Sequence, residues 1–259
     1  MAGDRRRSRR RRRLPREVQV QPLLRLDPRG RPVRRSAARA VSAIADPAAF
    51  VRANTRLSAP RLIPEIALHQ ADRLLPLWRA TEPDLAALGL PPPYWAFAWA
   101  GGQALARYLL DHPEVVAGKT VLDFGAGSGL GAIAAAKAGA ARAVAAEIDA
   151  FARTAIALNA AANGVAVEIA ADDLVGTDDA AWQIVIAGDV CYEQPMAGRV
   201  EAWLRSLARR VPVLIGDPRR SHFPAAGIEL VARYAVPTTT EIEDSDLRAA
   251  AVWRVLPGR

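Results

Sequence analysis

A glycine-rich segment directly after a short apolar run constrains the fold of this chain more than any other feature. Residues 121–131 read VLDFGAGSGLG, and an alanine-rich stretch continues to residue 138. The apolar run predicts a buried strand, and the alanine-rich stretch predicts a helix. Glycines at such a turn let the chain bend sharply and let a ligand approach the backbone. We therefore expect a strand, a ligand-binding turn and a helix here.

The same alternation of apolar runs and helical stretches continues toward the C-terminus. We predict helices over about residues 102–111, 151–163 and 196–209. The predicted strands cover residues 120–124, 143–147, 165–170, 183–189, 211–215, 228–240 and 249–256. Strands that alternate with helices indicate an α/β fold with a parallel sheet covered on both faces. The last two strands predict an antiparallel hairpin.

The charge is distributed unevenly along the chain. The first 35 residues contain 14 arginines and three acidic residues, a net charge of +11, whereas the whole chain carries +8. The remaining 224 residues therefore carry a net charge of −3. A run of like charges cannot bury itself, so we expect residues 1–40 to form a disordered, Arg-rich tail. Such a tail binds polyanions without specificity through counterion release, and it gives no reason to expect a specific nucleic-acid partner.

The rest of the chain divides into two predicted parts. Residues 41–100 are expected to supply an N-terminal helix and a segment that covers the ligand site, and residues 101–259 to form the core. Asp46-Pro47 predicts a helix through about Asn54, because Asp is a favourable N-cap and Pro a favourable first residue. Residues 63–69 fit a strand or a helical turn, and we expect Glu65 and His69 there to have a structural role rather than to bind a metal.

Composition excludes several classes of protein. With 51% apolar residues the chain can bury a large core, and no uncharged apolar run of about 18 residues is present to span a membrane. A single cysteine, Cys191, excludes a disulfide framework and a zinc site built from cysteines. One cysteine suggests a reducing compartment, and we expect a cytoplasmic protein.

The glycine segment permits two kinds of ligand. Gly127-x-Gly129-x-x-Ala132 satisfies a dinucleotide fingerprint, so a nicotinamide cofactor is one alternative. Asp123 argues against it, because a carboxylate would repel a pyrophosphate and attract a cation such as S-adenosylmethionine. The Asp-x-Gly-x-Gly-x-Gly pattern with the later Glu147 resembles class I methyltransferases. That resemblance implies that Glu147 accepts the ribose hydroxyls and that Asp172, or its neighbour Asp173, meets the adenine amino group.

Three further blocks resemble the electron transfer flavoprotein β-subunit lysine methyltransferases. They are PYWAFAWAGGQALARYLLD at residues 93–111, GDVCYE at 188–193 and GDPR at 216–219, and the likeness runs from about residue 50 to the C-terminus. The resemblance implies a Rossmann-like, seven-stranded class I methyltransferase sheet, mostly parallel with an antiparallel C-terminal hairpin strand. It further implies an S-adenosylmethionine-dependent protein-lysine methyltransferase that acts on the electron transfer flavoprotein β subunit.

The resemblance also assigns roles to individual residues. For cofactor binding it implies Trp99, Asp123, Gly125, Gly127, Gly129, Glu147 and Asp172. At the substrate lysine we expect Asp189 and Glu193 to orient the amine and Tyr192 to form a channel wall or a hydrogen bond. Alternatively, Asp189 and Glu193 cap the helix near residue 195. Asp217 and Arg219 are candidates for the substrate rim, and Cys191 is expected to be a buried apolar filler.

Two other functions remain open at this point. A ribosomal protein L11-type methyltransferase would have a similar glycine segment, although such enzymes usually carry an Asn-centred motif where this chain has residues 189–193. An RNA-binding protein on a methyltransferase scaffold would use the Arg-rich tail instead. The acids at 123, 147 and 189 argue against such a protein, because a scaffold without activity has no need of them.

Overall fold

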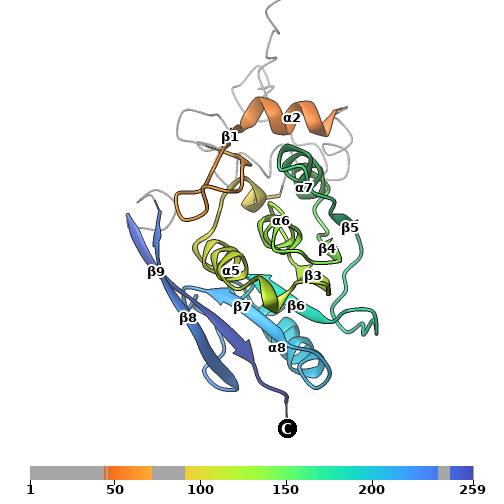
Figure 1. Cartoon of the computed structure of the whole chain (residues 1–259), viewed down its shortest axis with the longest axis vertical. Helices are drawn as coiled ribbons and strands as arrows, with labels where there is room; N and C mark the ends of the chain where they lie inside the picture. The colour runs from red at the N-terminus through yellow and green to blue at the C-terminus, as the bar shows by residue number, and fades with distance from the viewer. Residues whose placement is uncertain (1–43, 45, 72–90, 239–245, 259) are drawn as a thin grey trace, which may run out of the picture.

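Seven strands form one sheet in the computed structural model, which describes residues 44, 46–71, 91–238 and 246–258. The strand order is β5-β4-β3-β6-β7-β9-β8. The bounds are β3 (Thr120–Phe124), β4 (Arg142–Ala146), β5 (Glu168–Ala170), β6 (Ile184–Gly188), β7 (Val213–Asp217), β8 (Ile228–Pro237) and β9 (Leu247–Val255). The first five strands in the order are mutually parallel, and β9 and β8 are antiparallel to their neighbours (Figure 1). This confirms the predicted fold class.

Helices cover both faces of this sheet. The bounds of the helices are α2 (Pro47–Asn54), η1 (Tyr94–Ala96), α5 (Ala100–Asp111), η2 (Pro113–Val115), α6 (Leu130–Lys137), α7 (Ala150–Ala162) and α8 (Met196–Leu207). Helices α5, α6 and α7 pack on one face and α8 on the other (Figure 1). No helix in the described ranges is long and apolar enough to cross a bilayer.

The apolar runs of the strands follow from burial on both faces. In β3, Val121 belongs to the core beneath α5 and α6, whereas Leu122 belongs to the core beneath α8. Both side chains are fully buried. Because successive side chains point to opposite faces, a central parallel strand buries apolar side chains on both faces rather than only at every second position.

The segment before the sheet attaches to α7. Asp46 accepts a hydrogen bond from the Ala49 N–H (2.9 Å) and caps α2, as predicted, and the Phe50 and Phe151 rings lie 5.0 Å apart. The short strands β1 (Arg56–Ser58) and β2 (Leu68–Gln70) pair with each other. The buried Asn159 side chain of α7 accepts the backbone N–H of His69 at 2.7 Å.

Three details differ from the sequence prediction or lie beyond it. Strand β5 is three residues long, because Val165 hydrogen-bonds through its N–H to the Ala160 carbonyl at the end of α7 and does not join the ladder. The C-terminal hairpin forms as predicted, with a register shift in β8 between Leu230 and Ala232. The predicted disordered tail, residues 1–40, lies outside the described residues.

Glycines bring α5 into direct contact with the sheet. A Cβ on Gly216 of β7 would lie 2.1 Å from the Gly101 carbonyl oxygen and 2.7 Å from Cβ of Leu105. A Cβ on Gly188 of β6 would lie 2.9 Å from Cα of Gly102. Real Cβ atoms do not approach other atoms this closely, so only glycine allows the first turn of α5 to rest on the ends of β6 and β7.

Gly216→Ala should therefore destabilise the protein. The added methyl group would push α5 away from β7, and overpacking of this kind costs about 1–3 kcal/mol. Urea unfolding followed by circular dichroism measures the change. Gly198→Ala is the matched control, because Gly198 is exposed on α8 and a Cβ there has room; we expect it to be neutral or stabilising. Equal stability of Gly216→Ala and wild type would contradict the packing argument.

Candidate functional site

A cavity of about 660 Å³ lies at the carboxyl ends of β3, β4 and β6, beneath residues 91–99. This is the edge at which open α/β sheets bind their ligands. Eight of the ten predicted site residues line it: Trp99, Asp123, Gly125, Gly127, Glu147, Asp172, Asp189 and Tyr192. Gly129 and Glu193 are not part of its lining. Residues predicted from separate parts of the sequence therefore lie around one cavity.

Asp123 lies at the end of β3, where its carboxyl group meets the start of α6. Its Oδ2 accepts the Ala132 N–H at 2.8 Å, and a Cβ on Gly131 would lie within 2.9 Å of all three carboxyl atoms. Asp123 is almost completely buried. Burial raises the pKa of Asp123 to about 7; the hydrogen bond from Ala132 opposes this shift, and the charge of Glu147 adds to it.

Glu147 holds the glycine turn from the neighbouring strand. Its Oε2 accepts the Gly127 N–H and its Oε1 accepts the Asp149 N–H, both at 2.9 Å. Gly125 and Gly127 have φ angles of 63° and 52°, a left-handed conformation that glycine adopts without strain. The carboxylate therefore fixes the turn and also lines the cavity.

These contacts indicate which charge a ligand of the cavity can carry. In dinucleotide-binding folds, the free amides of the glycine turn and the helix N-terminus bind a pyrophosphate. Here the Gly127 amide is bonded to Glu147, and the Ala132 amide of α6 is bonded to Asp123. A phosphate would have to displace two carboxylates and overcome their charge. The geometry therefore favours a cationic or neutral ligand.

The two predicted residues outside the lining have different surroundings. Gly129 is the N-cap of α6 with φ of 78°, and a Cβ there would lie 3.1 Å from the Ile156 side chain of α7. It therefore serves the close packing of α6 on α7. Glu193 is exposed, and its carbonyl accepts the Ala197 N–H at the start of α8. No side-chain hydrogen bond caps α8.

Asp189 follows β6 in a left-handed conformation, with φ of 55°. Its Oδ2 accepts the Gly102 N–H of α5 at 2.7 Å. Its Oδ1 accepts hydrogen bonds from Nε and Nη2 of Arg220, at 2.8 and 2.7 Å. Non-glycine residues in this backbone conformation are uncommon and cluster at functional sites. Asp189 thus caps one helix, pairs with one arginine and lines the cavity.

The sequence analysis did not identify Arg220. It placed Arg219 and Asp217 at the rim, but Asp217 is fully buried and Arg219 lies over the Trp253 ring, 5.4 Å from its centroid. Arg220 lines the cavity instead, with Cζ 5.1 Å from the centroid of Trp99. Arg219 has φ of 66°. Because of this left-handed backbone conformation, the side chains of Arg219 and Arg220 point to different places.

Aromatic side chains form one wall of the cavity. The Tyr94 and Tyr192 rings lie 5.3 Å apart, and both side chains are more than 40% exposed. Trp99 contacts Phe97 edge-on at 5.7 Å and donates its Nε1–H to the Tyr94 carbonyl at 2.8 Å. Tyr94 was not predicted, although it belongs to the aromatic block at residues 93–111. Such a wall can bind a cation through the faces of its rings.

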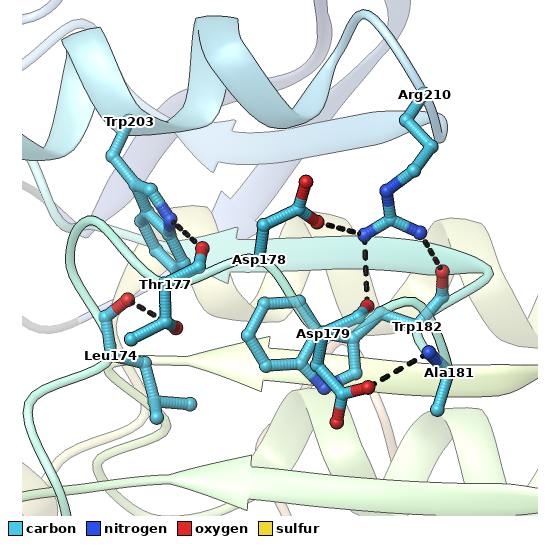
Figure 2. A network of polar contacts seen from close by, with 8 residues as sticks. All are labelled: Leu174, Thr177, Asp178, Asp179, Ala181, Trp182, Trp203 and Arg210. Atoms are coloured by element: carbon cyan, nitrogen blue, oxygen red, sulfur yellow. Dashed lines mark hydrogen bonds and ion pairs between the residues drawn. The ribbon is translucent and has the colours of Figure 1, made fainter.

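The loop after β5 is fixed at the end far from the cavity. Trp203 of α8 donates its Nε1–H to the Thr177 carbonyl at 2.7 Å, and Arg210 binds the Asp178 side chain and the Asp179 and Trp182 carbonyls (Figure 2). The other end of the loop carries Asp172 and Asp173, which line the cavity. The network therefore anchors the C-terminal part of the loop that carries these two acids.

Cys191 has an environment that excludes it as a nucleophile. The side chain is 1% exposed, and burial, followed by the charges of Asp217, Glu201 and Asp189, raises the pKa of the thiol to about 12. A protonated thiol is a poor nucleophile. The expected role as a buried filler agrees with this placement.

We expect the native Cys191 thiol to react with Ellman's reagent at pH 8 far more slowly than the unfolded chain. The pKa difference alone lowers the thiolate fraction on the order of a thousandfold. Because the chain has one cysteine, the absorbance change reports this thiol alone, and the same protein in urea is the control. A fast reaction of the native protein would show that the thiol is accessible and ionised.

Two comparisons match part of the chain. The family model of ribosomal protein L11 methyltransferase (PrmA) matches residues 103–189. A solved L11 methylase from Lactobacillus delbrueckii subsp. bulgaricus is 20% identical with a TM-score of 0.45, over 62% of this chain and 81% of that one.

Two curated relatives match over most of their length. The electron transfer flavoprotein beta subunit lysine methyltransferase of Danio rerio is 37% identical over 213 residues, 79% of this chain and 81% of the relative. The Homo sapiens protein of the same name is 38% identical over 217 residues, 81% of this chain and 82% of the relative. The chain therefore belongs to the family of electron transfer flavoprotein beta subunit lysine methyltransferases.

Proposed function

We propose that this protein transfers a methyl group from S-adenosylmethionine to a lysine side chain of the β subunit of an electron transfer flavoprotein. The proposal rests on the carboxyl groups of Asp123 and Glu147. They accept hydrogen bonds from backbone amides that would otherwise be available to a phosphate. They leave an acidic cavity at the ligand-binding edge of the sheet. Family membership supplies the reaction and the substrate. We include a cytoplasmic location in the proposal because the single cysteine suits a reducing compartment.

The residues present fit this cofactor. S-adenosylmethionine supplies an activated methyl group on a positively charged sulfur. Asp123 offers a buried carboxyl group to a cation, and Glu147 offers carboxylate oxygens to hydroxyl groups. Asp172, with Asp173 beside it, lies where it can accept a hydrogen bond from an amino group, and Trp99 provides an apolar face. A cavity of about 660 Å³ is within the usual range for small-molecule sites.

The substrate side of the cavity is assigned to the residues after β6. Tyr192 and Tyr94 form a wall along which an extended lysine side chain can lie. Glu193, exposed outside the lining, attracts the positively charged lysine toward the mouth. Asp189 is held from both sides and therefore orients the amine rather than abstracting its proton. Positioning of this kind accounts for much of the acceleration of a transfer reaction.

Incubation with labelled S-adenosylmethionine tests the substrate. We expect label on the purified electron transfer flavoprotein β subunit and none on ribosomal protein L11, the alternative raised by the match at residues 103–189. Mass spectrometry of the labelled protein locates the lysine. Protein lacking residues 1–40 should retain the activity, because the residues that line the cavity belong to the range 91–220. Label on L11 alone would show that L11, and not the β subunit, is the substrate. A loss of activity on removal of residues 1–40 would favour an RNA-linked function.

The raised pKa of Asp123 predicts pH-dependent cofactor binding. Below about pH 7 the carboxyl group is mostly neutral and attracts a cation weakly; above it the carboxylate forms and affinity rises. Between pH 6 and 7.5, we expect S-adenosylmethionine to bind roughly fivefold to tenfold more tightly at the higher pH. Calorimetry measures both dissociation constants. Asp123→Asn should bind weakly and lose this pH dependence, whereas a pH-independent wild-type affinity would contradict the assignment.

A further inference from the structure

Arg220 brings a fixed positive charge to the substrate end of the cavity. Its side chain is 18% exposed and is held in three ways. The guanidinium donates two hydrogen bonds to Oδ1 of Asp189, its Cζ lies 5.1 Å from the centroid of Trp99, and its backbone N–H donates to Oδ1 of Asp217 at 2.7 Å. A long side chain held at these points is preorganised rather than free to sweep the cavity.

The ion pair changes what Asp189 can do. Its Oδ1 faces Arg220, and its Oδ2 accepts an N–H from the positive end of α5. Both oxygens therefore have positive partners, and the net charge of the pair is close to zero. A carboxylate compensated in this way attracts an ammonium ion much less than an unpaired carboxylate would.

This compensation matters because the proton on a lysine blocks methyl transfer. A free lysine has a pKa of about 10.4, so removing its proton near pH 7.4 costs roughly 4 kcal/mol. A nearby cation disfavours the charged form and lowers the pKa, whereas an unpaired carboxylate raises it. Pairing Asp189 with Arg220 removes one carboxylate that would otherwise favour the ammonium ion.

Other ionisable groups lie around the pair. The remaining charged residues that line the cavity are Asp123, Glu147, Asp149, Asp172, Asp173 and Arg199. From the end of β7, Asp217 faces the backbone of Arg220. On the segment after β6, burial raises the pKa of both the Cys191 thiol and the Tyr192 hydroxyl, so both stay neutral at physiological pH, and Glu193 is not part of the lining.

We propose that Arg220 is a positioning residue that neutralises Asp189, so that the substrate lysine binds as a neutral amine and not as an ammonium ion. The inference rests on the proposed function. Nζ of the lysine loses its proton to solvent as the side chain enters, and no bond to the protein forms or breaks. The lone pair is then available for the methyl group.

Proton release on binding tests this directly, without turnover. The β subunit is titrated into the protein with sinefungin, whose amine replaces the sulfonium, in buffers of different ionisation enthalpy. We expect wild type to release a substantial fraction of one proton per site at pH 8, and Arg220→Gln to release less than half as much. Arg219→Gln is the matched control, since it removes the same charge outside the cavity lining.

The pH profile of kcat gives a second readout. In Arg220→Gln the unpaired Asp189 should move the acid limb upward by about one pH unit, and Arg220→Lys should retain most of the wild-type position. The double variant Asp189→Asn with Arg220→Gln should return the limb toward wild type, which a merely structural role of Arg220 would not produce.

The outcomes distinguish a failure of the role of Arg220 from a failure of the proposed function. Binding with equal proton release in wild type and Arg220→Gln overturns the role of Arg220 alone, as does an activity loss of the same size at every pH. Absence of any binding of the β subunit to wild type overturns the proposed function and this inference with it. A melting curve shows whether Arg220→Gln is folded. If it is not, Arg220→Lys and the double variant still test the role of Arg220.

Discussion

The site depends on carboxylates that stand at the ends of parallel strands and are held by amides at the starts of helices. Asp123 accepts the N–H of the third residue of α6, and Asp189 accepts the N–H of the third residue of α5. In each helix the second residue is a glycine, Gly131 or Gly101, whose missing Cβ leaves room for the carboxyl group. One interaction, used twice, therefore fixes two helices on the sheet and directs two acids into one cavity.

The same interaction decides which ligands the fold can accept. A helix N-terminus at the edge of a parallel sheet is usually an anion site. Here the protein supplies the anion from its own chain, so the cavity has negative charge where related folds have free amides. In its proposed role, Arg220 offsets this charge at the end where an amine must lose its proton. At the other end, Asp123 and Glu147 accept backbone N–H groups instead of an arginine side chain.

Much of the fold was predictable because the buried strands are apolar runs and because α2 begins at Asp46-Pro47, a favourable N-cap followed by a favourable first residue. Asp123 and Glu147 were predictable for the same reason, since the pattern places them at strand ends. Two other features were not predictable: which apolar residues join the strand ladder, and where neighbouring side chains point. Residues 165–167 are apolar enough for a strand but contact the core without joining the ladder. Nor does any local pattern specify the left-handed Arg219 that separates its side chain from that of Arg220.

The register shift in β8 has a consequence for how the molecule behaves among its copies. Strand β8 is the outermost strand on its side and spans ten residues, long enough to template the strand of another chain. The register of its pairing with β9 shifts between residues 230 and 232, and the exposed Glu229 and Arg233 flank this shift. On the opposite side, β5 offers only three residues. Register irregularities, charges and short edge strands are features that disfavour intermolecular strand addition, and the two margins of the described sheet carry them.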